Sequence, residues 1–433
     1  MSEISEYVAT EGPQEQLVAS ACAKNAWRLV LVLAVAYVVN YLDRNSIAYA
    51  GLTMNTALGL TARQFGWAAG ITTFSYALLE VPSNLFMQKI GARLWLSRIM
   101  ITWGIAAAAG ALVVGPNSLY LSRLILGAAE AGFFPGVIMY LAMWYPARYR
   151  TRVFAWFLLG IPVSSLVGGP AAGFLLGLDG YGHLAGWQWV FVAVGIPAVV
   201  LGFITWFLLV DHPRNAKWLT EAERTALLDA LEREPRAHSQ RDLGAALKDP
   251  RVLTLTVIQF GFTLGTYGIG IWLPLILKEH HLSNMQIGWL SVPPYLAACL
   301  GMLVWARQAD HHTGRILNLT ITCVLAAAGL VASVLFSGLT AQLVALTVAL
   351  IGVSSARAIF WTIPPRFLVG TAAAGGLAFI NSIGTLGGFF GPFTMGWLKD
   401  LTGSFNSGLL LMAVILAIAA AFSASLRLLI KDQ

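Results

Sequence analysis

The apolar positions of this 433-residue chain form long, nearly uninterrupted runs, and most polar positions fall between them. A membrane-spanning helix needs about 20 mostly apolar residues. The segments that meet this requirement are residues 27–55, 64–89, 94–115, 118–145, 150–178, 186–210, 251–278, 285–307, 315–336, 341–363, 369–399 and 405–429. The pattern therefore predicts an all-α membrane protein with twelve transmembrane helices.

Composition supports the same class. Hydrophobic residues make up 58% of the chain and charged residues 11%, and the mean hydropathy is +0.72. One water-soluble core could not bury this much apolar side chain. Residues 1–26 are polar and acidic and lack a positively charged start, so we expect a cytosolic tail and no cleavable signal peptide. Residues 430–433 are predicted to be a cytosolic C-terminus.

The basic residues predict the orientation. If the first span enters from the cytosol, all but six of the 27 Lys and Arg residues fall in cytosolic segments. Three lie on the far side (Arg63, Lys278, Lys399) and three lie inside spans (Arg44, Arg123, Arg357). This asymmetry is the positive-inside pattern, and it explains the net charge of +7 without a nucleic-acid partner.

The chain repeats itself at an offset of 222 residues. "QFGW" at 64–67 recurs as "QIGW" at 286–289, and "GP" at 169–170 recurs at 391–392. Arg93 and Arg315 keep the same offset. The repeat predicts two homologous bundles of six helices, residues 27–210 and 251–429, in parallel orientation. Two halves that rock around a central site are typical of transporters.

The stretch between the halves, residues 211–250, has a different composition, with 15 charged residues in 40. "WLTEAERTALLDALERE" predicts an amphipathic helix in which Thr220 caps the N-terminus and Glu223 completes a capping box. Leu227, Leu228 and Leu231 form its apolar stripe. We expect a cytosolic linker along the inner membrane surface; a regulatory or partner-binding helix is the alternative.

Charged residues inside spans are the candidates for function. Each costs about 2.5 to 3.5 kcal/mol at the centre of a membrane helix, so such residues must be paired or hydrated. The set consists of Asp43, Arg44, Glu80, Arg123, Glu130 and Arg357. Three acids and three bases can compensate one another, and protonation of one carboxylate leaves a positive site for an anion.

Helical spacing predicts which faces these residues share. Tyr37, Asn40, Tyr41 and Arg44 form a polar and aromatic stripe on the first span, expected on a cavity wall. In the fourth span, Arg123 and Glu130 share a face about two turns apart. Each therefore needs a partner from another helix, and Asp43 and Arg44 are the obvious candidates.

Other polar stripes lie on later spans. Gln259, Thr263, Thr266 and Tyr267 share a face of the seventh span; Arg357 and Trp361 share one of the tenth, and Asn381 and Thr385 one of the eleventh. The seventh-span stripe either lines the cavity or joins helices by hydrogen bonds.

Several stretches together resemble the bacterial branch of the anion:cation symporter family, within the major facilitator superfamily. They are "YLDRNSIAYA", "EVPSNLFMQKIGARLW", "RLILGAAEAGFFPG", "GWQWVF", "DHPRNAKWLTEAER" and "AFINSIGTLGGFFGP". The resemblance is greatest to tartrate, phthalate, 4-hydroxyphenylacetate and sugar-acid permeases. It implies alternating access and proton-driven import of a small organic anion across the bacterial inner (cytoplasmic) membrane by a multi-pass protein, which we expect to be a monomer.

The resemblance also implies residue roles. Asp43 and Glu130 match the protonatable pair, and Arg44 matches the arginine that binds the substrate carboxylate, a task suited to a planar guanidinium. Arg123 matches the superfamily's buried arginine of the fourth helix. The positions that match the lining of the substrate cavity are Tyr41, Tyr76, Trp361 and Asn381.

Some roles remain open from the residues alone. Arg123 is either architectural or part of the charge network, and Asp43 either couples protons or only neutralises Arg44. Glu80 is expected in a structural or gating ion pair, with Arg357 as a candidate partner; Arg357 is also a candidate second contact for a diacid. In the wider superfamily an acidic gate residue follows the second span; here position 88 is Gln, and only Asp310 of the second half fits. We therefore assign Arg93, Asp310 and Arg315 to the gating loops.

Two other functions are compatible with a membrane protein of this composition. A proton-coupled exporter or exchanger could share the fold, although buried arginines disfavour cationic cargo. A membrane enzyme would need a nucleophile, base or metal arrangement, and none is evident. His280 with His281 and His311 with His312 lie in loops and do not indicate a metal site. We expect no cofactor, with protons as the coupling ion.

Overall fold

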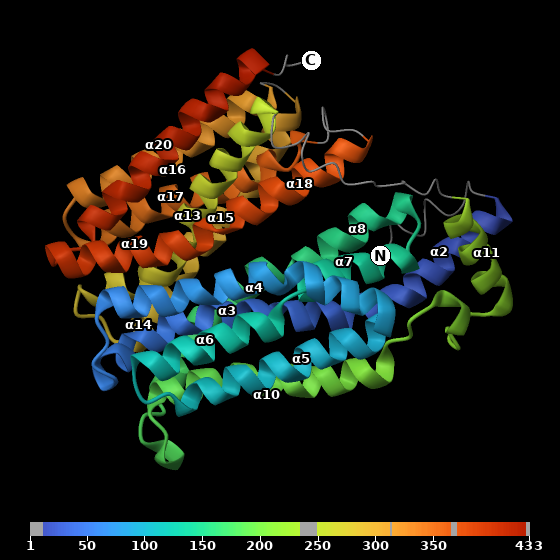
Figure 1. Ribbon diagram of the computed structural model, residues 1–433, viewed down its shortest axis with the longest axis horizontal. Helices are drawn as coiled ribbons and strands as arrows, with labels where there is room; N and C mark the ends of the chain where they lie inside the picture. The colour runs from blue at the N-terminus through green and yellow to red at the C-terminus, as the bar shows by residue number, and fades with distance from the viewer. Residues whose placement is uncertain (1–11, 234–248, 312–313, 365–369, 430–433) are drawn as a thin grey trace.

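The computed structural model describes residues 12–233, 249–311, 314–364 and 370–429. Within these ranges the chain is helical and contains no strand. Figure 1 shows long helices in two groups, one blue to green and one yellow to red, which correspond to the two halves of the chain. The predicted all-α fold with two six-helix bundles is confirmed.

Eight helices make up the six spans of the first half, because the fourth and fifth spans are each divided in two. The helices are α3 (Leu31–Ala57), α4 (Ala62–Ile90), α5 (Ala92–Ala109), α6 (Pro116–Glu130), α7 (Phe133–Trp144), α8 (Ala147–Leu158), α9 (Gly160–Leu176) and α10 (Gly186–Leu208). Short helical turns lie before α3 at η2 (Ala26–Val30), between α5 and α6 at η3 (Gly110–Leu112), between α9 and α10 at η4 (Tyr181–His183), and after α10 at η5 (Pro213–Asn215).

The second half divides its eighth and eleventh spans in the same manner. Its helices are α13 (Pro250–Lys278), α14 (Asn284–Leu290), α15 (Val292–His311), α16 (Arg315–Leu335), α17 (Leu339–Phe360), α18 (Gly370–Thr385), α19 (Gly387–Thr402) and α20 (Asn406–Leu429).

Ten segments of the described chain are long and apolar enough to cross a membrane by themselves. The two remaining spans are the second and the eleventh. Helix α4 includes Glu80 within its apolar sequence, and the eleventh span is divided into α18 and α19 of 16 residues each. These two spans carry polar or broken stretches that neighbouring helices must cover.

Equivalent helices pack in equivalent ways in both halves. In the first half α5 packs on α10, α3 on α10, and α4 on α6; in the second, α16 packs on α20, α13 on α20, and α15 on α17. These pairs are related by the 222-residue offset. The internal repeat predicted from the sequence therefore corresponds to a repeated helix arrangement.

The glutamines of the repeated motifs start equivalent helices. Thr61 accepts a hydrogen bond from the Gln64 backbone N–H, and the Gln64 side chain accepts one from Thr61 N–H, so the two form a capping box for α4. Ser283 and Gln286 do the same for α14. A capping box satisfies two N–H groups that a helix start would otherwise leave unpaired.

The glycines of the repeated motifs join the two halves. A Cβ on Gly66 would lie 3.1 Å from the carbonyl carbon of Pro392, and a Cβ on Gly288 would lie 2.9 Å from that of Gly169. The "QxGW" motif of each half thus packs against the "GP" motif of the other half, with no room for a side chain. We call this end of the molecule the closed end.

Hydrogen bonds reinforce the closed end. The backbone N–H groups of Ala62 and Arg63 donate to the two carboxylate oxygens of Asp400 at 3.0 and 2.9 Å. Figure 1 shows the ribbons of the two halves meeting near α14 and α19 and separating toward the opposite end, where α8 and α11 lie. We call that opposite end the linker end.

The fourth span is broken where the sequence predicts one continuous helix. Helix α6 ends at Glu130, Ala131 is non-helical, and Gly132 adopts a left-handed conformation with φ of 89°. A residue with a side chain rarely adopts this conformation. The break places Glu130 at the last position of α6, so its carboxylate is held at a kink.

The predicted amphipathic helix is confirmed as α11 (Glu221–Glu232), with Thr220 and Glu223 forming the capping box. It packs on a helix that the sequence did not predict, α2 (Pro13–Asn25), which lies in the expected N-terminal tail. Leu227 is fully buried, and the same apolar cluster includes Val18 and Cys22 of α2. The linker helix and the N-terminal helix are therefore joined to the core of the first half.

Polar contacts connect α2 and α11. Lys24 Nζ forms an ion pair with Glu223 Oε1 at 2.7 Å, and the Ser20 hydroxyl donates to the same oxygen at 2.6 Å. Trp218 Nε1 donates to Asn25 Oδ1 at 2.8 Å, and the Trp218 ring stacks on Trp144. These contacts join the tail, the linker and the first half into one unit.

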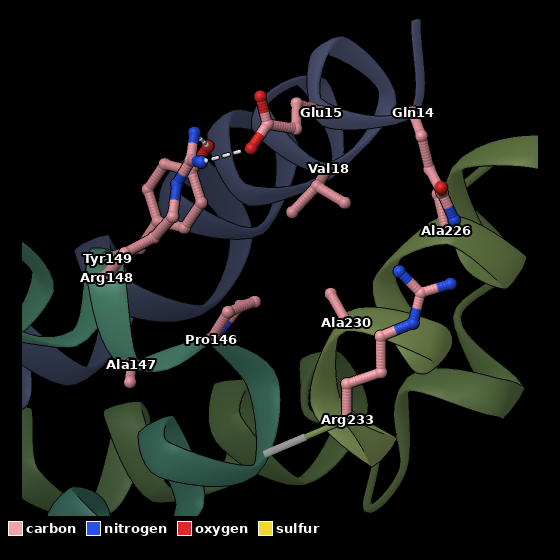
Figure 2. A pocket seen from close by; sticks show the side chains of 10 residues that line it. All are labelled: Gln14, Glu15, Val18, Pro146, Ala147, Arg148, Tyr149, Ala226, Ala230 and Arg233. Carbon is pink, nitrogen blue, oxygen red and sulfur yellow. Dashed lines mark hydrogen bonds and ion pairs between the residues drawn. The ribbon is translucent and has the colours of Figure 1, made fainter. Parts of the chain in front are cut away.

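A pocket of about 340 Å³ opens at the linker end between α2, α8 and α11. Figure 2 shows Arg148 bonded to Glu15 above the Tyr149 ring, with Arg233 reaching in from the end of α11. The Arg148–Glu15 distance is 2.8 Å, and both side chains are about half exposed. Because its lining comes from the tail, the linker and the start of α8, this pocket is separate from the charged residues of the spans.

Glu223 makes the attachment of α2 dependent on pH. Burial raises the pKa of Glu223, but hydrogen bonds from Lys24, Ser20 and Thr220 outweigh that effect and lower it from 4.5 to about 2. A carboxyl with a lowered pKa stabilises the folded state above its ordinary pKa, and that contribution is lost as the pH falls from about 4.5 toward 2. Glu223→Gln should remove it at neutral pH.

We predict that Glu223→Gln increases the opening of α2 by roughly 5- to 30-fold, which corresponds to about 1 to 2 kcal/mol. Maleimide labelling of Cys22, which is buried in α2, measures this opening when Cys299 and Cys323 are replaced by serine. Glu221→Gln, on the same turn but exposed, is the matched control and should label at the wild-type rate. Equal labelling of both variants would contradict the assignment.

Candidate functional site

Arg44 and Glu130 form an ion pair between the first and fourth spans. Arg44 Nε donates to Glu130 Oε1 at 2.7 Å; the Glu130 side chain is 1% exposed and that of Arg44 is 21% exposed. The sequence predicted that Arg123 and Glu130 would each need a partner from another helix, with Asp43 and Arg44 as candidates, and this pair confirms the prediction for Glu130. The Arg44 side chain is therefore partly accessible from outside the pair, whereas the Glu130 side chain is not.

Aromatic rings flank the Arg44 guanidinium. Its Cζ lies 4.6 Å from the ring centroid of Tyr76 and 5.7 Å from that of Tyr41. From the second half, Tyr267 is close enough to interact electrostatically with Arg44 and with Tyr41. Because Tyr267 of the second half lies within electrostatic range of the guanidinium, Arg44 faces the interface between the halves and not lipid. Tyr267 belongs to the predicted seventh-span stripe but was not among the predicted site residues.

The first-span stripe divides between two environments. Asn40 is buried and its side-chain amide donates to Glu130 Oε1 beside Arg44. Tyr37 is 3% exposed, and its ring stacks on Phe157 with centroids 4.2 Å apart. Only Tyr41 and Arg44 of the stripe are partly exposed. Tyr37 and Asn40 therefore lie on the buried side of the Arg44–Glu130 pair. The expectation that the whole stripe lines a cavity is wrong for these two residues.

Asp43 and Arg123 are a second, looser charge pair. They are 1% and 2% exposed and close enough to interact electrostatically. Neither Asp43 oxygen, nor Nε or Nη2 of Arg123, has a hydrogen-bond partner in the described ranges. The Arg123 Cζ instead lies 4.4 Å from the centroid of the Phe191 ring. Fully buried charges without hydrogen bonds are costly, so this pair is sensitive to the protonation of Asp43.

Polar residues of the second half face the same region. Gln259 Nε2 donates to Asn381 Oδ1 at 3.2 Å, which joins α13 to α18. The Thr266 hydroxyl donates to the Phe262 carbonyl at 2.7 Å. Gln259 is 4% exposed, so this part of the seventh-span stripe joins helices. Asn381 is half-buried and Trp361 is 39% exposed, which leaves both able to contact a ligand.

Glu80 and Arg357 do not form the ion pair that the sequence suggested. In the described part of the chain neither side chain makes an ion pair within 4.0 Å. Glu80 instead interacts electrostatically with Arg44, and Arg357 does so with Tyr41. Both side chains are half-buried. The two residues are therefore each within electrostatic range of the Arg44 region without being paired with one another.

The gating-loop residues occupy other positions. Arg93 is anchored to the end of the sixth span, because its backbone N–H donates to Asp211 at 2.8 Å and its Nε to the Trp206 carbonyl at 2.6 Å. Arg315 Nη1 donates to the Thr362 carbonyl at 3.3 Å. The side chain of Asp310 lies outside the described residues. Asp211 is thus the acid that contacts Arg93 in the first half.

Taken together, these groups define a membrane transporter of two six-helix bundles. A partly exposed guanidinium, flanked by two tyrosines of the first half and within electrostatic range of one of the second, binds an internal carboxylate that an external carboxylate could replace. No group of three His, Cys, Asp or Glu side chains that could hold a metal occurs among the described residues.

Residues 33–392 match the model of the Major Facilitator Superfamily, and the chain belongs to that family. A protein of Agrobacterium vitis named "Putative tartrate transporter" is 44% identical over 93% of this chain and 90% of its own. A "Quinolone resistance transporter" of Acinetobacter baumannii is 41% identical over 90% of this chain and 91% of its own.

The fold is also similar to solved structures. The crystal structure of a D-xylose-proton symporter superposes with a TM-score of 0.74 at 15% identity, covering 92% of this chain and 97% of that one. At this identity the similarity concerns the fold alone. The family and these relatives are transporters, so the protein is a transporter and not an enzyme.

Proposed function

We propose that the protein is a proton-coupled symporter that imports a small organic carboxylate by alternating access. The observation that carries the proposal is the Arg44–Glu130 pair, at 2.7 Å and open on the arginine side. Substrates of the expected type are a tartrate-like hydroxy acid, a sugar acid or an aromatic acid. The name of the Agrobacterium vitis relative supports the first of these classes.

Exchange of one carboxylate for another on Arg44 would couple the anion to a proton. Protonation of Glu130 removes the charge that holds the guanidinium, and the carboxylate of the substrate then takes its place. Asp43, the second acid of the proposed proton-coupling pair, lies within electrostatic range of Glu130, Arg44 and Arg123, so its protonation depends on the charge of the Arg44–Glu130 pair; Arg123 keeps its charge throughout. After the halves close and reopen, loss of the proton restores the Arg44–Glu130 pair and displaces the substrate.

Stoichiometry decides the driving force. One proton with one monoanion is electroneutral and uses only the pH gradient, about 1.4 kcal/mol per pH unit. A second proton would add about 2.3 kcal/mol per 100 mV of membrane potential.

We propose that the linker end faces the cytosol of a bacterial inner membrane, because the basic residues gather there. The protein would act as a monomer without a cofactor.

Export is the second candidate. A relative that is 41% identical is named "Quinolone resistance transporter", and a transporter linked to resistance favours this candidate. The same charge pair could serve a proton-coupled exporter or exchanger of organic anions. Liposomes with an inside-alkaline gradient distinguish the directions: a symporter accumulates labelled acid inside, whereas an antiporter does so only when the gradient is reversed.

We predict that Arg44→Lys lowers the affinity for the transported acid by at least about 30-fold. An ammonium is a point charge that cannot make the bidentate contact of a guanidinium. Thermal shift and calorimetry with tartrate, gluconate, phthalate and 4-hydroxyphenylacetate measure the affinity. Arg98→Lys, on α5 and stacked on Trp95, is the control and should bind normally. Near-normal affinity of Arg44→Lys would refute the anchor role.

We predict that Glu130→Gln binds and exchanges the acid but does not accumulate it under a pH gradient. Glutamine keeps the shape of the side chain and cannot release a proton. Counterflow in liposomes measures exchange, and uptake under the inside-alkaline gradient measures coupling. If Glu130→Gln concentrates the acid as wild type does, the coupling assignment is wrong.

A further inference from the structure

One of the charged residues within the spans, Arg357, has no acidic partner among the residues that the structure describes. Glu130 pairs with Arg44, Asp43 interacts with Arg123, and Glu80 interacts with Arg44. Arg357 forms no ion pair or hydrogen bond within the described ranges and is half-buried in α17. A guanidinium within a membrane span is costly unless an anion or water compensates it.

The packing of α17 places Arg357 on the side of the helix that faces α13. Val353, one turn before Arg357, lies against α13, because a Cβ on Gly265 would be 3.1 Å from its Cγ1. Phe360, one turn after Arg357, contacts Phe262 of α13 with ring centroids 5.2 Å apart. Residues three or four apart share a helix face, so Arg357 also lies on the side of α17 that faces α13.

Helix α13 in turn packs on α3, which carries Tyr41 and Arg44. Tyr41 interacts electrostatically with both Arg44 and Arg357. Tyr41 is therefore within electrostatic range of two guanidiniums, one from each half of the molecule. This direction also argues against an Arg357 that extends away from the bundle to lipid headgroups.

We propose that the substrate is a dicarboxylate whose two carboxylates bind Arg44 in the first half and Arg357 in the second. The inference rests on the proposed function and specifies its substrate class. Trp361, one turn after Arg357 and 39% exposed, would cover the carbon chain between the two carboxylates. A monocarboxylate would leave one guanidinium without an anion.

Such a clamp links binding to the motion of the halves. A diacid neutralises one cation on each half and so favours their approach, whereas a monoacid neutralises only Arg44. Selectivity for diacids would then appear in binding and in transport.

The experiment uses matched ligand pairs on the full-length purified protein. Each dicarboxylate of the panel above is compared with its monoamide, which differs by one charge at nearly constant shape. We expect wild type to bind at least one diacid about 10- to 100-fold more tightly than its monoamide. Arg357→Gln should reduce diacid affinity by the same factor and change monoamide affinity less than about threefold.

Two variants keep the test decisive. Arg357→Lys retains the charge and should recover part of the diacid preference, and unchanged monoamide binding by Arg357→Gln shows that the protein is folded. Arg427→Gln, which removes an exposed charge from the last turn of α20, should behave as wild type.

Equal loss of diacid and monoamide in Arg357→Gln, or no loss of either, would overturn the inference. Wild type that prefers no diacid over its monoamide would overturn it as well. In these cases proton-driven accumulation of a monocarboxylate would leave the proposed function standing. Absence of proton-driven accumulation of any acid of the panel would count against the proposed function itself.

Discussion

The need to compensate a guanidinium inside a bilayer is the constraint on which the site depends. Arg44 lies in the middle of α3, and Glu130 accepts its Nε hydrogen at 2.7 Å. Asn40 donates to the same carboxylate, and Tyr41 and Tyr76 flank the guanidinium. The kink at Ala131 and Gly132 holds Glu130 at the end of α6. Because the arginine stays partly exposed while the acid is buried, the pair is stable when empty and open to exchange from one side.

The closed end would give the proposed exchange of carboxylates on Arg44 a direction. Gly66 and Gly288 pack against the backbone of the opposite half, so both sides of the pseudosymmetric interface are in contact there. The halves separate toward the linker end, where α2 and α11 are attached to the first half. A transporter that alternates must break the glycine contacts and form new ones at the linker end. Because Gly66 and Gly288 have no side chains, the helix backbones of the two halves can approach closely at these positions and can separate without disengaging interlocked side chains.

Much of the fold could be predicted because the bilayer imposes a simple length and polarity rule. The twelve segments, the repeat and the capping box at Thr220 followed from it and from the local chemistry of helix starts. The Arg44–Glu130 pair followed from charge compensation. Helix α2 could not be predicted, because its partner Glu223 lies 199 residues away from Lys24. The contact of Asp211 with the Arg93 backbone N–H could not be predicted either, because the two residues are far apart in the sequence. The kink after Glu130 depends on a single left-handed glycine, Gly132.

Proton uptake on substrate binding tests the central claim most directly. If an external carboxylate displaces Glu130 from Arg44, the displaced acid must take up a proton, and binding is linked to pH. In weakly buffered detergent solution, the account predicts uptake of about one proton per anion bound by wild type and none by Glu130→Gln. Tight binding of the anion by wild type without any change in proton concentration would contradict it.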